Sequence, residues 1–338
     1  MRSFSSVAGA ACLAVLTTVL TAGPVSAAGP ASAGDIGADG FTIEDPRIKE
    51  SSGLAASRQH PGIYWTHNDS DDGAFLYAVD ARSGKTVATL TLTGVGRPRD
   101  VEAISLGPDG NLYVGDIGDN LGGTWNHVWV YKVPEPKKLV DRTVKATQYV
   151  VKYADGPRDA EALMVHPKTG RVYITDKKDD GATLYAGPAK LSPSGTNVFR
   201  RVSDIDLWVT DGAFSPDGRQ LALRGYLGGV LYDWKGDKPK RVDRLRIPLQ
   251  RQGESLTWTP DGKTLLYGSE GLGSDVEPRK APGGSGGGPD GDGSDGSDGS
   301  AAGDGSGDDG GGFTQGAALL VVLLVAVFGV RRLRRGKG

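Results

Sequence analysis

Short runs of β-branched, aromatic and aliphatic residues fill the chain from Phe41 to Lys280, separated by Gly, Pro, Asp and Asn. Representative runs are Phe-Leu-Tyr-Ala-Val at 75–79 and Leu-Tyr-Val at 112–114. No stretch of this region keeps the 3.6-residue period of an amphipathic helix. Short apolar runs bounded by turn-forming residues are typical of β-strands. The pattern therefore predicts an all-β domain, with a sandwich, a barrel or a propeller as the candidate architectures.

One pattern of residues repeats along this region. It consists of a polar entry segment, a first strand, a turn that is Pro-Asp-Gly in the clearest copies, and a second strand. The five copies lie at residues 52–67, 98–116, 157–176, 211–223 and 254–268. In the first copy two further strands follow, at 75–79 and 86–92. The repeating unit is therefore expected to contain four strands.

Four-stranded units that recur every 45–60 residues, roughly, are typical of β-propeller blades. We predict a β-propeller of about five blades, and a six-bladed ring with one unrecognised blade is the alternative. The fifth copy ends before its fourth strand. We expect Phe41-Thr42-Ile43 to supply that strand and to close the ring.

Two features of the repeats resemble known propeller families. The turns at 107–110 (Gly-Pro-Asp-Gly) and 215–218 (Ser-Pro-Asp-Gly) resemble those of bacterial YVTN/WD-type propellers. The Asp-x-Glu-Ala segments at 100–103 and 159–162 are similar to segments of β-propeller phytases and their esterase-like relatives. The resemblance is one of pattern and covers residues 50–271. It implies a propeller fold, and its phytase-like part implies a calcium-dependent phosphoester hydrolase.

The antiparallel order of strands predicts that acidic residues of different repeats share one face of the ring. Each turn carries the chain to the opposite face, so the start of a first strand lies beside the end of the second strand. Three glutamates occupy one position of the repeat, and an aspartate lies at a neighbouring position: Glu102, Glu161, Glu254 and Asp211. The loops after the second strands add Asp69, Asp116, Asp119 and Asp176.

Carboxylates this close cannot all stay ionised without a cation, a basic neighbour or raised pKa values. Calcium suits a site with oxygen ligands alone, whereas zinc would need His or Cys. We predict calcium ligands at Glu102, Glu161, Glu254, Asp116, Asp119 and Asp176. We predict ligand contacts at Arg99, Arg158, Lys177, Asp69 and Asp211. The alternative is structural, with the acids binding backbone amides and locking one blade to the next.

The N-terminal residues predict secretion. Residues 1–28 combine a basic start, a short apolar run and the small-residue exit Val25-Ser26-Ala27, which together describe a signal peptide. Cys12 is the only cysteine and lies within this segment. We therefore expect a mature domain without disulfides, located outside the cytoplasm.

The C-terminal residues predict a membrane anchor. Residues 281–315 are almost entirely Gly, Ser, Asp, Ala and Pro, which predicts a disordered linker. Residues 313–330 carry no charge, and we expect a single transmembrane helix at 316–330. The basic tail at 331–338 then lies on the cytoplasmic side, with the N-terminal domain outside. The membrane is thus one predicted partner.

The charge balance argues against nucleic acid as a partner. The chain has 39 Lys and Arg against 41 Asp and Glu. Without Arg2, the five basic tail residues and the seven linker aspartates, 33 basic residues face 34 acidic ones. A domain close to neutral lacks the basic character of a nucleic-acid binder.

No nucleophile–base pair with a recognisable spacing is present in the domain. The sequence therefore predicts a membrane-tethered extracellular propeller that binds a ligand or protein partner at an acidic channel mouth. The alternative is the calcium-dependent phosphoester hydrolase, phytase-like or esterase-like. Both an enzymatic and a non-enzymatic function agree with this pattern.

Overall fold

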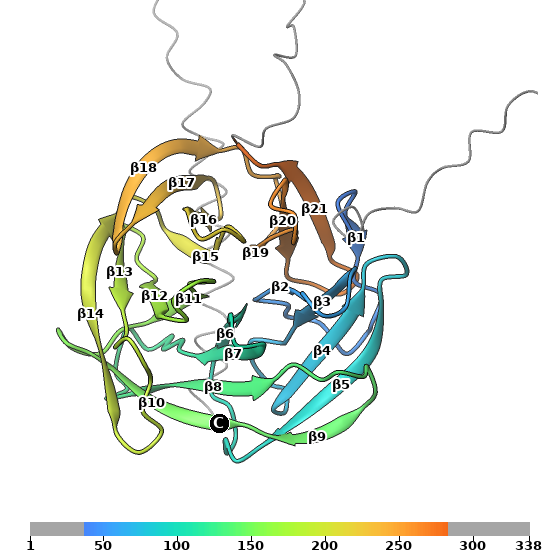
Figure 1. The fold of residues 1–338 in the computed structure, drawn as a ribbon, viewed down its shortest axis with the longest axis horizontal. Coiled ribbons are helices and arrows are strands. Elements are labelled where there is room, and N and C mark those ends of the chain that lie inside the picture. Colours follow the sequence, from blue (N-terminus) through green and yellow to red (C-terminus); the bar gives the residue numbers. More distant parts are fainter. Residues whose placement is uncertain (1–36, 283–338) are drawn as a thin grey trace, which may run out of the picture. The chain divides into compact units, whose positions relative to one another are not determined.

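The computed structural model describes residues 37–282, and every regular element in that range is a β-strand. This confirms the all-β prediction, and the strands are arranged around a central axis in a propeller-like fold (Figure 1). Within this range no helix has the length and apolar character needed to cross a membrane. The predicted signal peptide, membrane helix and basic tail lie outside the described residues, as does the linker after its second residue.

The described strands form four hydrogen-bonded sheets. The first contains β2 (Ala55–Ala56), β3 (Ile63–Thr66), β4 (Phe75–Asp80), β5 (Lys85–Thr93) and β9 (Arg142–Lys145). The second contains β6 (Val101–Leu106), β7 (Asn111–Asp116), β8 (Val128–Pro134), β10 (Thr147–Tyr153), β14 (Thr196–Ile205), β13 (Ala182–Ala186), β12 (Val172–Asp176) and β11 (Ala160–Val165). The third contains β15 (Val209–Phe214), β16 (Gln220–Gly225), β17 (Gly229–Lys235) and β18 (Lys238–Leu245). The fourth contains β19 (Gly253–Trp258), β20 (Thr264–Ser269), β21 (Asp275–Lys280) and β1 (Phe41–Thr42).

The eight-stranded sheet consists of two repeat units joined at their outer edges. β10 pairs with β8 in antiparallel fashion and with β14 in parallel fashion, so it belongs to one unit and contacts the next. The preceding strand, β9, pairs in parallel with β5 of the first sheet. The segment 142–153 therefore connects three successive units along the rim, which the repeat pattern did not predict.

The first and last parts of the domain meet in one sheet. β1 pairs with β21, with Phe41 opposite Val276 and Thr42 opposite Asp275. This is the pairing that the sequence predicted for Phe41-Thr42-Ile43. Ile43 and Ile48 follow this strand and are buried among residues of the first and fourth sheets. Burial of these aliphatic side chains stabilises the junction through the hydrophobic effect.

The first strand of each unit lines the central axis. β2, β6, β11, β15 and β19 are innermost in Figure 1, and each contacts the next around a closed ring, with β19 in contact with β2. Hydrophobic clusters fill the spaces between successive units; one of them joins Trp65 and Leu90 of the first sheet to Val114 and Tyr131 of the second. The ring is therefore held by contacts between neighbours, and the inner strands are the elements that position side chains along the axis.

Candidate functional site

The inner strands share an irregularity near their beginnings. In β6 the pairing register shifts between Val101 and Ala103, which leaves Glu102 as an extra residue. The pairing register shifts in the same way in β11, β15 and β19. In the first sheet the register also changes by one residue, between the isolated Ser51–Asn68 bridge and the ladder of β2 with β3. A β-bulge of this kind redirects one side chain. The residues at the bulge position are Glu102, Glu161, Thr210 and Glu254, and Ser52 holds the matching place, directly after the bridged Ser51, in the first sheet.

This register assigns Asp211 a role different from that of the glutamates. Thr210 holds the bulge position in β15, and Asp211 follows it in the regular ladder opposite Arg224. The buried carboxylate of Asp211 accepts a hydrogen bond of 2.7 Å from the backbone N–H of Leu256 in the next inner strand. Its structural partner is thus a backbone amide of the neighbouring unit.

The three glutamates meet two further side chains from the loops that follow second strands. Lys177 follows β12 and its Nζ forms an ion pair with Glu161. Tyr226 follows β16 and its hydroxyl donates to Oε1 of Glu254 over 2.9 Å. All five side chains are buried or nearly so. We call Glu102, Glu161, Glu254, Lys177 and Tyr226 the acid cluster.

Two other contacts complete its geometry. Ser52, at the matching place in the first sheet, donates to Oε2 of Glu102 over 3.1 Å. The Oε2 atom of Glu254 is buried and has no hydrogen-bond partner among the described residues. A side-chain hydrogen bond of Gln252 lowers the pKa of Glu254, and Oε2 is not its acceptor. The acid cluster therefore retains one acceptor that no side chain of residues 37–282 satisfies.

Burial sets the charge state of this cluster. It raises the pKa of Glu102 well above the ordinary value, and the neighbouring Glu161 raises it further. Burial likewise raises the pKa of Glu161 and of Glu254, although Lys177 opposes this shift in both. For Lys177, burial lowers the pKa, but Glu161 and the other acidic groups outweigh it and raise the pKa overall. Lys177 thus faces three carboxyl groups that retain protons more strongly than exposed glutamates do, and Arg224 also acts to lower the pKa of Glu254.

We expect the free energy of unfolding to decrease as the pH rises above about 4.5, the ordinary pKa of glutamate. The folded-state pKa of Glu102 is raised, so its contribution is complete below 4.5 and is lost as the pH rises through the folded pKa. Glu102→Gln keeps the side chain neutral and should flatten this decrease. Urea unfolding between pH 4.5 and 8.5 measures it, and the exposed Glu44→Gln is the control. An equal pH slope in wild type and Glu102→Gln would contradict the expectation.

The three aspartates predicted as metal ligands bind backbone amides. Asp116 accepts hydrogen bonds from the N–H groups of Arg99 and Asp100 and from the hydroxyl of Tyr131. Asp119 accepts one of 2.6 Å from the N–H of Trp125. These contacts hold the loops that follow β7.

Asp176 has an equivalent place after β12. It accepts from the N–H of Thr183 and lies 3.5 Å from Arg158 and 3.6 Å from Lys178. The binding of backbone amides agrees with one part of the structural alternative. These contacts, however, lie within one unit and do not join one blade to the next.

The predicted ligand contacts outside the acid cluster also have partners within the domain. The guanidinium of Arg99 lies between two indole rings, 3.8 Å from that of Trp125 and 3.7 Å from that of Trp129. Asp69 is buried, and its backbone carbonyl accepts from the N–H of Val101. Lys177 is therefore the predicted ligand residue that interacts with all three glutamates, and Asp69 acts to raise the pKa of Glu102.

A calcium site requires several oxygen ligands around one point. Residues 37–282 contain no group of three or more His, Cys, Asp or Glu side chains that could hold a metal ion. Lys177 supplies a positive charge next to Glu161. Glu102 and Glu254 also raise the pKa of Lys177, which keeps this charge in place. The donor set in this part of the chain thus does not fit calcium well, and the calcium prediction stays a prediction.

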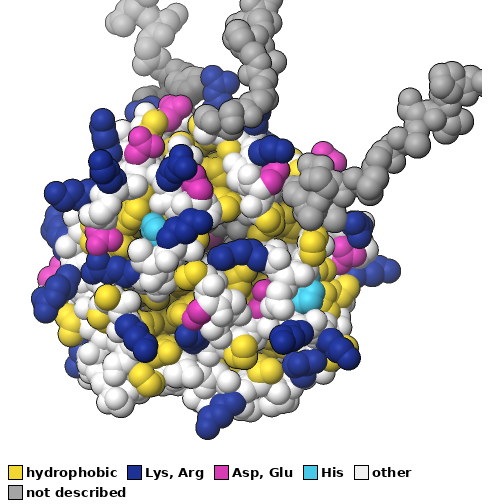
Figure 2. Space-filling model, in the orientation of Figure 1, with side chains coloured by type: hydrophobic (Ala, Val, Ile, Leu, Met, Phe, Trp, Pro, Cys, Tyr) yellow, Lys and Arg dark blue, Asp and Glu magenta, His cyan; other side chains and the backbone are white. Residues whose placement is uncertain are grey.

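The opposite end of the inner strands has a different chemistry. Glu102 lies at the start of β6 and Leu106 at its end, about 13 Å further along the strand. There the inner strands surround a pocket whose lining includes the large apolar side chains of Phe214, Pro216 and Trp258. Figure 2 shows a hollow near the centre of the ring with hydrophobic side chains around it. Sequence reasoning missed this pocket, although large apolar residues directly before the turns at 107–110, 215–218 and 259–262 are the signal that could have indicated it.

No protein-family model and no curated protein matches this sequence. Among solved structures, it is similar to the PQQ-bound aldose sugar dehydrogenase of Streptomyces coelicolor, with 12% identity, 72% of this chain and 99% of that chain covered, and a TM-score of 0.41. It is also similar to the WD40 repeats of RRP9, with 12% identity, 68% of this chain and 80% of that chain covered, and a TM-score of 0.38. A third similar structure is hydrazine synthase of Kuenenia stuttgartiensis, with 13% identity, 65% of this chain and 61% of that chain covered, and a TM-score of 0.37. The chain therefore spans less than two thirds of that protein. These similarities are too low to carry any argument about function.

Proposed function

We propose that this protein is a membrane-tethered, extracellular five-bladed propeller that binds a small cationic ligand at the acid cluster. The predicted signal peptide, linker and membrane helix support the location, and the closed ring of inner strands supports the blade number. The acid cluster supports the ligand class. Three buried carboxyl groups with raised pKa values would be stabilised in their ionised forms by a bound cation, which favours a cationic ligand.

One observation carries this proposal: the fold does not need glutamate at the bulge position. Thr210 occupies it in β15 and Ser52 holds the matching place in the first sheet, and the register shifts by one residue in both. A buried carboxyl group without full hydrogen bonding is costly. Three such groups at positions that accept a small neutral side chain therefore indicate a role in binding rather than in folding.

The unpaired oxygen of Glu254 defines what the ligand must supply. A carboxylate oxygen accepts hydrogen bonds, so its partner is a donor. A protonated amine provides up to three donors together with the positive charge that the cluster lacks. The ligand class we propose is therefore a small primary amine in its ammonium form.

The test measures the unfolding temperature of the purified full-length protein with increasing putrescine or ethanolamine at constant ionic strength. Binding to the folded state alone raises the midpoint by mass action. We expect a saturable increase that Glu254→Gln weakens by at least about tenfold in apparent affinity, because a charge-assisted hydrogen bond is lost. Glu44→Gln should leave it unchanged. The proposal fails if neither amine raises the midpoint, or if Glu254→Gln leaves the increase unaltered.

The hydrolase alternative has one supporting observation, the raised pKa of Glu102 and Glu161. A carboxyl group that keeps its proton near neutral pH can act as a general acid. Hydrolysis of p-nitrophenyl phosphate, measured with calcium and with EDTA, tests this alternative. A rate above that of Glu161→Gln would favour it, and a rate at the level of buffer would exclude this substrate class.

A further inference from the structure

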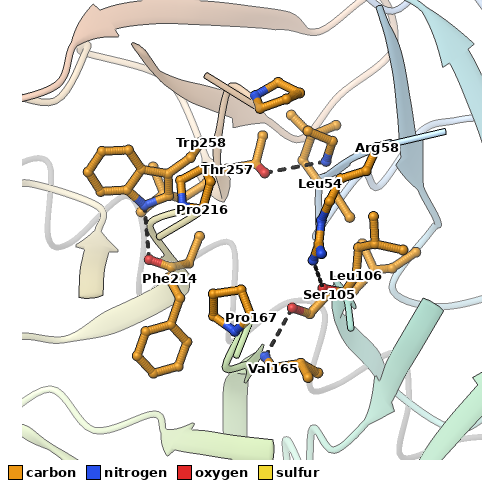
Figure 3. Close-up of a pocket in the computed structure, with 17 residues that line it drawn as sticks. Leu54, Arg58, Ser105, Leu106, Val165, Pro167, Phe214, Pro216, Thr257 and Trp258 are labelled. Atoms are coloured by element: carbon orange, nitrogen blue, oxygen red, sulfur yellow. Dashed lines mark hydrogen bonds between the residues drawn. The ribbon is translucent and has the colours of Figure 1, made fainter. Parts of the chain in front are cut away.

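The pocket at the end of the ring opposite the acid cluster has room for a small ligand. Its cavity is about 80 Å³, enough for a few water-sized groups. The ends of five inner strands and the prolines of three turns surround it. Figure 3 shows Pro167, Pro216, Phe214 and Trp258 on one side with Leu106 and Arg58 on the other. The pocket is thus formed at the centre of the fold by several repeats together.

Hydrogen bonds between neighbouring units hold its walls. The indole N–H of Trp258 donates to the carbonyl of Ala213 over 3.1 Å. The backbone N–H of Val165 donates to the hydroxyl of Ser105 over 3.0 Å (Figure 3). These polar groups are occupied by one another, and the apolar side chains that remain, such as Leu106, Pro216 and Trp258, lie beside polar surface of similar extent. A cavity whose lining is fixed in this way is pre-organised, which lowers the entropic cost of binding.

Arg58 is the one charged side chain among the described residues that line the pocket. Its Nη2 donates to the backbone carbonyl of Leu106 over 2.8 Å, and no Asp or Glu within residues 37–282 forms an ion pair with it. A guanidinium has five N–H donors in a planar fork that matches a carboxylate. The interaction with Leu106 fixes the side chain at the pocket rim and leaves further donors for a ligand.

We propose that this pocket binds a carboxylic acid with a compact apolar body, the carboxylate on Arg58 and the body against Leu106, Pro216 and Trp258. The acid is either a free molecule or the C-terminal residue of a peptide, because both present the same carboxylate beside an apolar group. This binding site goes beyond the proposed amine site and lies at the other end of the inner strands. The two sites have opposite charge preference.

Isothermal titration calorimetry of the full-length protein with isovalerate and with N-acetylglycyl-leucine tests both sources of the carboxylate. Isovaleramide has the same apolar body without the charge. Arg58→Gln removes the guanidinium at an exposed rim position, where the fold tolerates the change. Arg219→Gln removes an equal charge beside a Pro-Asp-Gly turn, where the side chain is 85% exposed, and serves as the matched control.

We expect saturable binding of at least one acid, weakened at least about tenfold by Arg58→Gln and by the amide probe, and unchanged by Arg219→Gln. Isovalerate binding alone identifies a free acid, and N-acetylglycyl-leucine binding alone identifies a peptide terminus. Absence of saturable binding by both acids overturns the proposal, as does binding that Arg58→Gln leaves intact. Glu254→Gln should not change this binding, so the result is independent of the amine site.

Discussion

Lys177→Met is expected to lower the free energy of unfolding by about 3–5 kcal/mol at neutral pH, the largest effect of any substitution in the acid cluster. The side chain is 11% exposed and its ion-pair partner Glu161 2% exposed. Removing the ammonium takes away the cation that lowers the pKa of all three buried carboxyl groups. They must then either remain charged at high cost or bind protons, so the loss should be larger at pH 8 than at pH 5.

The neighbouring residue provides a matched control. Lys178 has the same chemistry, but its side chain is 42% exposed and its nitrogen lies 3.6 Å from Asp176. Lys178→Met should cost less than about 1 kcal/mol, because exposed ion pairs contribute little. Adding Glu161→Gln to Lys177→Met should restore part of the lost stability. Equal unfolding midpoints for the two lysine variants in urea would refute this view of the cluster.

Gly253→Ala is expected to have the second largest effect, a destabilisation on the order of 2–4 kcal/mol. A Cβ atom at Gly253 would lie 1.7 Å from Nη2 of Arg224. Arg224 is fully buried, and its Nη1 donates to Gln250, to the carbonyl of Ser255 and to that of Gly268, each over 3.1 Å. Displacing the guanidinium would break these bonds and leave buried polar groups unsatisfied.

Two further variants separate this steric effect from the general cost of alanine at glycine. Gly228 has open space around its Cβ position, so Gly228→Ala should change the free energy of unfolding by less than about 0.5 kcal/mol. The double variant Gly253→Ala, Arg224→Met removes the colliding group, and its loss should be smaller than the sum of the single losses. Additive losses in thermal or urea unfolding would show that Arg224 does not determine the need for glycine.

Short-range patterns predicted much of the fold correctly. The strand at 75–79 lies within β4, that at 86–92 lies within β5, and the turns of the repeat fall between paired strands. These features depend on the alternation of neighbouring residues and on the turn chemistry of Pro, Asp and Gly, both of which are local. The pairing of Phe41–Thr42 with the last sheet was also predictable, because the fifth copy lacked a strand.

The partners of the acidic residues were not predictable in the same way. Asp211 was predicted at a position next to that of the glutamates, and the structure places Thr210 at the bulge with Asp211 after it. That Asp211 binds the N–H of Leu256 in the next inner strand was not predictable. The sequence also did not indicate that Glu254 meets Tyr226, which lies 28 residues earlier. A bulge changes which side chain faces the axis without changing the periodic pattern, so the pattern alone cannot locate it.

The sequence by itself determined the strands, the turns, the repeat and the end of the ring at which the glutamates lie, because each follows from residues close together in the chain. Only the tertiary structure decided that Lys177 pairs with Glu161, that Asp116 binds backbone amides, and that Arg58 reaches Leu106 beside a pocket. These contacts join different repeats or loops. They exist because ring closure and strand register bring side chains together at distances of a few ångströms, which no local pattern of residues encodes.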